Sequence, residues 1–257
     1  MFAAIFPAVS TRKGRFNVRF AATSADVEAA QRLRHLAFVT ARGQRGSGSG
    51  LDRDDFDALC RHVLIEDAKT GQLVCTYRFQ DFQGGGDLSR SYCAQYYDLD
   101  ALARYEGRMM EVGRFCIHPD WHDGDVLRTA WAAMTAYVDA SGIDLLFGCS
   151  SFEGTDWMVH GDALAMLKHR HIGPKHWLPQ IKAPIVFKFA ARLRRKPDAK
   201  RAARAMPPLL KTYLMMGGWV SDHAVVDRQL GTMHVFTGVE IASIPDARKK
   251  LLRAAAM

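Results

Sequence analysis

The chain has 257 residues, of which 48% are hydrophobic and 24% are charged, and its formal net charge is +8. These values are those of an ordinary globular protein and exclude a disordered or fibrous chain. No apolar run approaches the roughly 18–20 residues that a membrane span needs, so we expect no spanning segment. The positive charge favours an acidic partner, which at this stage is nucleic acid, anionic lipid, a phosphate-bearing donor or an acidic protein.

The cysteines and histidines form no recognisable metal or disulfide pattern. The five cysteines are widely spaced without a CxxC pair, which argues against a disulfide framework or a zinc ribbon. The histidines at 160, 169, 171 and 176 lack a nearby cysteine or carboxylate set, so we expect no metal site. The apolar start at residues 1–9 is too short for a signal peptide, and a cytoplasmic protein is therefore expected.

Residues 1–15 are expected to be a flexible N-terminus. Apolar alternation predicts a strand at residues 16–22. Ser24 is expected to cap the helix that follows, whose apolar stripe reaches Phe38. The glycine- and serine-rich stretch at 43–50 predicts a flexible loop.

Two strand patterns at 62–67 and 72–81 flank Thr70-Gly71 and predict a hairpin. The further expected elements are a strand at 108–117, a helix at 124–141 ending near Gly142, a strand at 143–149, a helix at 155–170 and a last strand at 233–241. This order predicts an α/β (α+β) protein with a mixed central sheet flanked by helices. No GxGxxG or GxxxxGK[ST] pattern is present, so no nucleotide fingerprint is predicted.

The strand Glu111-Val112-Gly113-Arg114-Phe115 is the most informative segment for chemistry. An acid and an arginine three apart on an apolar strand are costly unless they pair or serve a substrate. A structural ion pair is the simpler interpretation, and a catalytic or substrate-binding pair is the alternative.

Other charged residues need partners of the same kind. Arg78 lies in a strand that is otherwise largely apolar, and Asp54 and Asp57 follow one another in a loop. Arg34 is placed on the first helix, one turn before Phe38. Taken singly, Asp54 and Asp57 fit a solvated or capping acid cluster, and Arg34 fits a surface arginine.

Taken in order, these segments resemble a known family. Arg34…Phe38, Asp54-x-x-Asp57, Thr76-Tyr77-Arg78 and Glu111-x-x-Arg114-Phe115 are similar to the acyl-carrier-protein-dependent branch of the GNAT acyltransferases. That branch contains the acyl-homoserine-lactone synthases and the L-ornithine N-alpha-acyltransferases, which make lyso-ornithine lipid.

Three further segments favour the ornithine acyltransferases. Glu111-Val112-Gly113-Arg114 resembles their E-[LV]-G-R strand, and residues 146–155 (LFGCSSFEGT) resemble their FG-x-[AS]-SF-x-G segment. Residues 207–213 (PPLLKTY), Gly217 and residues 225–227 are similar to their C-terminal part, which lactone synthases generally lack. The resemblance covers about residues 16–245. It implies a GNAT-like core at 16–182 and a basic helical C-terminal extension, packed on that core, at 183–257.

One segment departs from the usual GNAT pattern. The pyrophosphate loop is normally an Arg/Gln-x-x-Gly-x-Gly/Ala turn, whereas residues 121–126 are WHDGDV, with one glycine and two acids. Acids at a helix N-terminus repel a pyrophosphate. The departure disfavours coenzyme A and fits the single phosphate of a 4'-phosphopantetheine arm carried by acyl carrier protein.

The resemblance implies transfer of a 3-hydroxyacyl chain from acyl carrier protein to the α-amine of L-ornithine, with no cofactor bound by the enzyme itself. Glu111 is expected to position or deprotonate the amine, and Arg114 to hold a carboxylate, either that of the substrate or that of Glu111. The substrates are expected to contact Arg34, Phe38, Asp54, Asp57, Arg78, Phe115, Cys116, Ser150 and Ser151. Ser150 and Ser151 are not expected to be nucleophiles, because no G-x-S-x-G elbow surrounds them and direct transfer needs no acyl-enzyme.

The basic segment, residues 188–204, carries eight lysines and arginines against one aspartate. A solvated face is the simplest interpretation. Arg192, Arg194, Arg195 and Lys196 are expected instead to dock acidic acyl carrier protein or an anionic membrane surface, which places the protein in the cytoplasm or peripherally at the inner face of the membrane. Nucleic acid is not expected, since the segment lacks interleaved aromatic residues.

Three alternatives stay open from the sequence: an acyl-homoserine-lactone synthase using S-adenosylmethionine, an acyl-CoA-dependent N-acyltransferase, and a non-catalytic membrane- or RNA-binding protein. Acyl-chain length, oligomeric state and preference for ornithine over lysine have no signature in the sequence.

Overall fold

The computed structural model describes residues 15–43 and 48–256. Residues 1–14 of the expected flexible N-terminus, and residues 44–47 of the expected loop, lie outside this part. The strands are β1 (Phe16–Phe20), β2 (Arg61–Asp67), β3 (Leu73–Phe82), β4 (Tyr97–Asp98), β5 (Met109–Ile117), β6 (Leu145–Glu153), β7 (Gln180–Ile181), β8 (Val186–Phe187), β9 (Trp219–Val220), β10 (Ala224–Asp227) and β11 (Thr232–Glu240).

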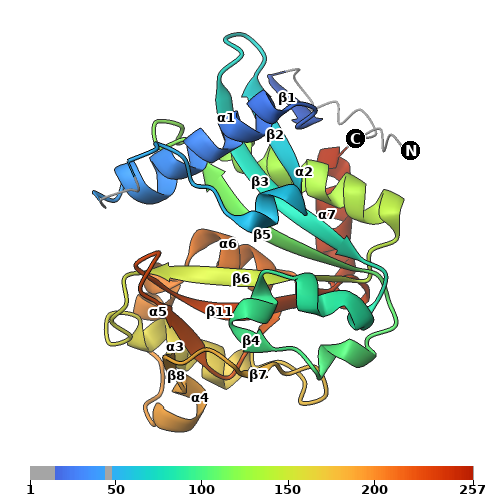
Figure 1. Cartoon of the computed structure of the whole chain (residues 1–257). Helices are drawn as coiled ribbons and strands as arrows, with labels where there is room; N and C mark the ends of the chain where they lie inside the picture. The colour runs from blue at the N-terminus through green and yellow to red at the C-terminus, as the bar shows by residue number, and fades with distance from the viewer. Residues whose placement is uncertain (1–14, 44–47, 257) are drawn as a thin grey trace. The chain divides into compact units, whose positions relative to one another are not determined.

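The α-helices are α1 (Ser24–His35), α2 (Gly124–Ser141), α3 (Gly161–Arg170), α4 (Phe189–Arg192), α5 (Ala199–Ala205), α6 (Pro208–Met215) and α7 (Asp246–Ala256) (Figure 1). Short helical turns are η1 (Leu36–Thr40), η2 (Asp55–Ala58), η3 (Gly85–Arg90), η4 (Cys93–Gln95), η5 (Leu102–Arg104) and η6 (Ile241–Ser243). In the described part of the chain, no helix combines the length and the apolar character needed to cross a bilayer.

The main sheet has the strand order β1-β2-β3-β5-β6-β11-β10-β8, with β9 paired to β11. The pair β5–β6 is parallel, whereas β1–β2, β2–β3, β6–β11 and β10–β11 are antiparallel. A mixed, mostly antiparallel sheet with flanking helices confirms the predicted fold class. The chain divides into two compact units.

The first unit consists of residues up to Gln80, Val112–Gly142 and the chain from Asp246. Its β2–β3 hairpin turns at Thr70-Gly71, where Gly71 has a φ of 71°. Helix α2 ends at Gly142, which takes the left-handed conformation that glycine adopts readily at this position. Both features confirm the sequence predictions. Helix α7 packs on α2, and Arg253 forms an ion pair with Asp139 at 2.8 Å.

Strand β3 presents different chemistry on its two faces, because successive side chains of a strand point in opposite directions. Phe79 packs against Tyr137 of α2 with ring centroids 4.6 Å apart. Arg78, its neighbour, is also buried and points to the opposite face, where it meets carboxylates. The strand therefore supplies the core on one side and a charged site on the other.

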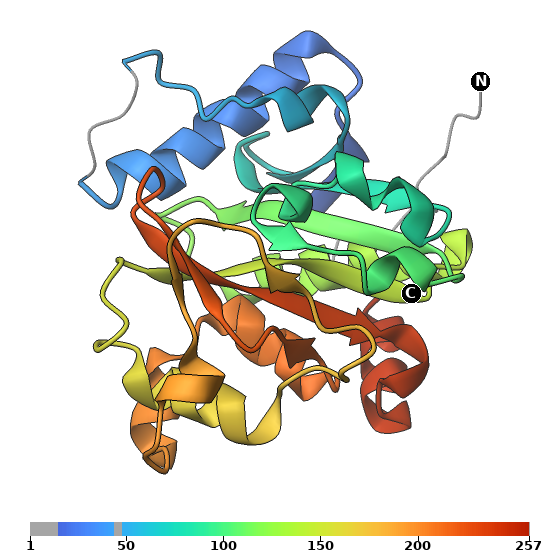
Figure 2. The ribbon, with the colours of Figure 1, turned by 60° about the horizontal axis from the view of Figure 1, so that its bottom comes forward.

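The second unit consists of residues 81–111 and 143–245. Its longest pairing joins β6 to β11, from Glu153↔Thr232 to Leu145↔Glu240. Val235 belongs to an apolar cluster with Leu164, Phe189 and Leu210, whereas Phe236 belongs to a second cluster with Phe82 and Trp219. Figure 2 shows the orange helices of residues 189–215 on one side of β11 and the green segment around residues 84–104 on the other.

The two units cut across the boundary at residues 182/183, which stays a prediction. Three element predictions were wrong in detail. The strand expected at 143–149 begins at Leu145 and continues to Glu153, because residues 150–153 also pair with β11. Thr23, not Ser24, caps α1, since its hydroxyl accepts a hydrogen bond from the Asp26 amide in a capping box. The helix expected at 155–170 begins only at Gly161, because Asp156 accepts the amide of Met158 and holds the preceding residues in a turn.

Candidate active site

The first group of site residues is centred on Arg34 of α1, whose side chain is only 1% exposed. Its Nε donates to Asp52 Oδ2 at 2.8 Å, and its Nη2 donates to Asp57 Oδ2 at 2.9 Å and to the Asp52 carbonyl. Gln31, one turn earlier on the same helix face, donates to Asp57 at 2.8 Å. Helix α1 therefore binds Asp52 in the loop before η2 and Asp57 within η2.

That loop is shaped by its own carboxylates. Asp54 caps η2 by accepting the Phe56 amide at 3.0 Å, and Asp57 accepts the Asp54 amide in return. This reciprocal arrangement satisfies backbone donors at the start of the turn. The same oxygens also accept arginine donors, Asp54 Oδ1 from Arg78 and Asp57 Oδ2 from Arg34.

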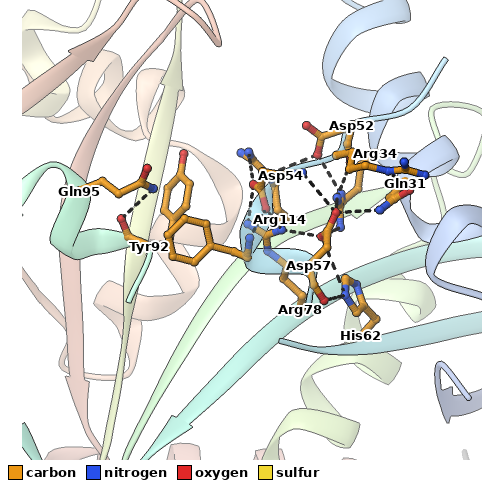
Figure 3. A network of polar contacts seen from close by, with 12 residues as sticks. Gln31, Arg34, Asp52, Asp54, Asp57, His62, Arg78, Tyr92, Gln95 and Arg114 are labelled. Carbon is orange, nitrogen blue, oxygen red and sulfur yellow. Dashed lines mark hydrogen bonds and ion pairs between the residues drawn. The ribbon is translucent and has the colours of Figure 1, made fainter. Parts of the chain in front are cut away.

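Arg78 and Arg114 bind the same carboxylates from the sheet (Figure 3). Arg78 donates to both oxygens of Asp54, at 2.5 and 2.7 Å, and to Asp57 at 2.6 Å. Arg114 donates to Asp54 at 2.9 Å, and its Nε lies 3.3 Å from Asp52. Three arginines and three aspartates thus form one network of balanced charge, which we call the arginine–aspartate platform: Arg34, Asp52, Asp54, Asp57, Arg78 and Arg114.

The platform keeps Asp54 and Asp57 ionised. Burial alone would raise the pKa of Asp54, but hydrogen bonds from Arg78 and the charges of Arg78 and Arg114 lower it below the ordinary value. The pKa of Asp57 is likewise lowered, because the hydrogen bonds and charges of Arg34 and Arg78 outweigh burial. The side chain of Asp54 is 23% exposed, whereas that of Asp57 is 7% exposed. Asp54 is therefore the more accessible of the two carboxylates.

Arg114 has an unusual backbone. Its φ is 53°, the single positive φ of a non-glycine residue in the described chain. An arginine in this region is strained, and such strain is retained where the surroundings hold the side chain in place. The contacts with Asp52 and Asp54 hold the Arg114 side chain in place. The structure thus gives Arg114 carboxylate partners from the loop. That Arg114 holds a carboxylate of the substrate or of Glu111 stays a prediction.

Glu111, three residues earlier on β5, lies in the second unit and is 5% exposed. Its Oε1 accepts the Cys93 amide at 2.7 Å and its Oε2 accepts the Tyr92 amide at 2.8 Å. Burial raises the pKa of Glu111 to about 7, although the two amides favour the ionised form. The carboxyl group therefore exchanges its proton near neutral pH, as a general base requires.

Two cysteines lie beside this carboxylate. The thiols of Cys93 and Cys149 are 3.4 Å apart, and Cys93 is fully buried. Burial raises the pKa of the Cys93 thiol, and the nearby Cys149 and Glu111 raise it further. Cys93 is therefore a neutral thiol, which is a poor nucleophile.

The other predicted site residues are spread over both units. Phe115 stacks on Tyr77 with centroids 5.6 Å apart, and Cys116 is buried, which raises the pKa of its thiol to about 12. Phe38 lies in η1 under the guanidinium of Arg42.

Ser150 is buried and accepts a hydrogen bond from Thr237, whereas Ser151 is exposed. Arg192, Arg194, Arg195 and Lys196 are all exposed.

The N-terminus of α2 is occupied by its own cap. Asp123 Oδ1 accepts the Asp125 amide at 2.8 Å, and its other oxygen pairs with Arg15. The pKa of Asp123 is lowered, mainly by the hydrogen bond from the Asp125 amide and to a smaller extent by Arg15. A negative charge therefore stands where the GNAT pattern places a pyrophosphate.

Sequence reasoning missed several members of these groups. Asp52 completes the platform and Gln31 donates to its Asp57. Their only sequence signals are the acid-rich stretch at 52–57 and the three-residue spacing of Gln31 and Arg34. The amides of Tyr92 and Cys93 carry no sequence signal, because any residue offers a backbone N–H. Across the described residues, no cluster of three or more His, Cys, Asp or Glu suits a metal ion.

Known proteins are similar to most of this chain. The family description "Acetyltransferase (GNAT) domain" matches residues 33–132. An L-ornithine N(alpha)-acyltransferase of Rhodobacter capsulatus is 32% identical over 248 residues, which cover 91% of this chain and 93% of that protein. A protein of the same name from Brucella abortus is 32% identical over 247 residues, covering 91% and 87%. The solved structure of an N-acyl amino acid synthase from uncultured soil microbes has a TM-score of 0.50 and 12% identity, covering 89% of this chain and 93% of that one.

Proposed function

Because the chain belongs to the family of L-ornithine N(alpha)-acyltransferases and has the GNAT fold, we propose that this acyltransferase acylates the α-amine of L-ornithine. The observation that carries the proposal is the 32% identity over 91% of the chain and 93% of the relative. The acyl group is a 3-hydroxyacyl chain, the donor is an acyl carrier protein thioester, and the product is lyso-ornithine lipid.

Glu111 is the general base in this proposal. The reaction requires that the amine lose a proton, that it attack the thioester carbonyl, and that the thiol of the pantetheine arm leave. A buried carboxyl group with a pKa of about 7 is poised to take the amine proton directly or through one water. The amides of Tyr92 and Cys93 fix the orientation of the carboxylate.

The arginine–aspartate platform is the proposed binding site for the amino acid. Asp54 is more exposed than Asp57 and binds the side-chain ammonium of ornithine. Asp57 and Arg78 hold the Asp54 carboxylate in place. Arg114 is shared between Asp52 and Asp54, and a substrate carboxylate competes for its guanidinium. Arg34 orients Asp52 and Asp57 and acts as a positioning residue.

The capped start of α2 supports acyl carrier protein over coenzyme A as the donor. The carboxylate of Asp123 takes one of the amides that would otherwise bind a pyrophosphate, and it adds negative charge. The exposed basic segment then serves to dock an acidic partner, which is the carrier protein or an anionic membrane surface.

The test is expression in a host that lacks ornithine lipid, followed by mass spectrometry of the lipid extract. A new lyso-ornithine species carrying a 3-hydroxyacyl amide supports the proposal. A Glu111→Gln variant, expressed at the same level, is the matched control and is expected to yield little product. An acyl-homoserine lactone in the medium, or an unchanged lipid extract from a well-expressed protein, contradicts it.

A further inference from the structure

The turn before α3 exposes three consecutive large apolar side chains. Trp157 is 38% exposed, Met158 is 65% exposed and Val159 is 71% exposed. No other three consecutive large apolar side chains are this exposed in the part of the chain that the structure covers. Single exposed apolar residues are common on protein surfaces, but a contiguous group marks an interaction site.

The turn is held in shape from beneath. The ring of Trp157 stacks on Phe187 with centroids 4.3 Å apart. His160 is buried and its Nε2 contacts the carbonyl of Glu153 at 2.7 Å, while the Trp157 carbonyl accepts the His160 amide. Met158 and Val159 are therefore presented on a fixed support, and their exposure follows from the fold.

Basic residues adjoin this turn. Phe187, which supports Trp157, is followed directly by Lys188 and α4. Arg195 pairs with Asp162 in the first turn of α3 at 3.0 Å, and its guanidinium lies close to Gly161. The Asp198 amide, at the start of α5, also donates to Asp162. These contacts bring the basic segment, whose lysines and arginines are all exposed, next to the apolar turn.

We propose that the turn Trp157–Val159 inserts into the interface of an anionic membrane while the adjoining basic segment binds the lipid headgroups. An apolar tip bordered by lysines and arginines is the arrangement by which monotopic proteins bind anionic bilayers. Acidic carrier protein would satisfy the charges but would leave Met158 and Val159 without a reason for exposure. The inference deepens the proposed function, on which its purpose rests, since a lipid product needs an exit into a membrane.

The test uses the full chain and sedimentation with vesicles of phosphatidylcholine, with or without phosphatidylglycerol. We expect binding to the anionic vesicles that weakens as salt is added. The double variant Met158→Ser/Val159→Ser is expected to bind about tenfold more weakly or worse, because two apolar side chains no longer enter the interface. A triple variant with Arg192, Arg194 and Lys196 changed to Gln is expected to lose at least about tenfold at low salt; Arg195 is kept because it pairs with Asp162.

Met215→Ser is the matched control, since Met215 is 57% exposed at the end of α6, outside the turn. It is expected to bind within about twofold of the unaltered protein, as an exposed substitution away from the contact does. Circular dichroism and the melting temperature confirm that each variant is folded. Brominated phospholipids are expected to quench tryptophan fluorescence, and Trp157→Phe to remove most of that quenching.

The proposal is overturned if the double variant binds vesicles like the unaltered protein, or if Met215→Ser loses as much. It is also overturned if the double variant keeps vesicle binding but raises the KM for acyl carrier protein, which would make the turn a protein-docking surface. Vesicle binding is measured without substrate. Failure of membrane insertion is therefore distinguishable from failure of acyl transfer, which the lipid extract reports separately.

Discussion

Arg78 binds Asp54 through two hydrogen bonds, from Nη1 to Oδ1 at 2.5 Å and from Nη2 to Oδ2 at 2.7 Å. The Arg78 side chain is 3% exposed, so the pair is shielded from solvent on the arginine side. A bidentate pair of this kind specifies geometry as well as charge, which a lysine at the same position would not reproduce. The position of Asp54, the proposed substrate-binding carboxylate, thus depends on a buried arginine of the sheet.

The first prediction concerns the stability that this pair provides. Arg78→Met is expected to lower the free energy of unfolding by about 3 kcal/mol, because Asp54 and Asp57 then lose the buried guanidinium that pairs with both of them. Urea denaturation measures the change. Arg32→Met on α1 is the control: Arg32 is 60% exposed and pairs with Glu28, so its loss is expected to cost less than about 1 kcal/mol. Equal costs for both variants would show that the platform is not a stabilising network.

Much of the local structure was predictable, because short-range signals determine it. The Thr70-Gly71 turn and Gly142 at the end of α2 are such signals, and both lie where expected. The position of β11 beside β6 was not predictable, since it depends on pairing between residues about 80 to 95 positions apart in the chain. Thr23 and Ser24 are both good caps, and only the geometry of the Asp26 amide decides between them.

The candidate site was predictable only in part. The resemblance singled out Arg34, Asp54, Asp57, Arg78 and Arg114, and the structure brings these five into one network. Nothing in their spacing alone showed that they meet. The partners of Glu111 are backbone amides, which carry no residue-type signal, and Asp52 resembled any loop acid until its distances to Arg34 and Arg114 were known.

The second prediction is a pH dependence of the rate set by Glu111. Because burial raises its pKa to about 7, kcat/KM is expected to rise as pH increases through 7 and Glu111 loses its proton. Glu111→Gln is expected to lower turnover by about 10²–10⁴-fold and to flatten this limb of the profile. Glu153→Gln, an exposed position on β6, is expected to leave both unchanged. If kcat/KM of Glu111→Gln still rises through pH 7 as in the unaltered protein, the general base is another group.

The third prediction concerns stability and also follows from the raised pKa of Glu111. The folded pKa of Glu111 lies above its unfolded value, so the folded state binds the proton more tightly. Its contribution to stability is therefore complete below the ordinary carboxyl pKa and is lost as pH rises through about 7. Denaturation curves between these limits are expected to show this loss in the unaltered protein and a smaller one in Glu111→Gln. Identical pH dependences would contradict the assignment.

The fourth prediction separates the backbone of Arg114 from its side chain. Arg114→Ala and Arg114→Gly both remove the pairs with Asp52 and Asp54, and both are expected to reduce turnover. The glycine variant is expected to be more stable than the alanine variant by about 1 kcal/mol, because only glycine adopts a positive φ without strain. Thermal unfolding of the two proteins measures this difference. A more stable alanine variant would mean that residue 114 does not keep this conformation.

The fifth prediction tests donor choice at the start of α2. Asp123→Ser retains a side-chain cap for the Asp125 amide but removes the negative charge, so the helix is expected to lose less than about 1 kcal/mol. The KM for 3-hydroxyacyl-CoA is expected to fall, because the pyrophosphate is no longer repelled, whereas the KM for the acyl carrier protein donor is expected to stay unchanged. Asp120→Ser is the control, since Asp120 is exposed and precedes the helix by several residues. A KM for the coenzyme A donor that remains as high as in the unaltered protein would show that the charge of Asp123 does not set donor preference.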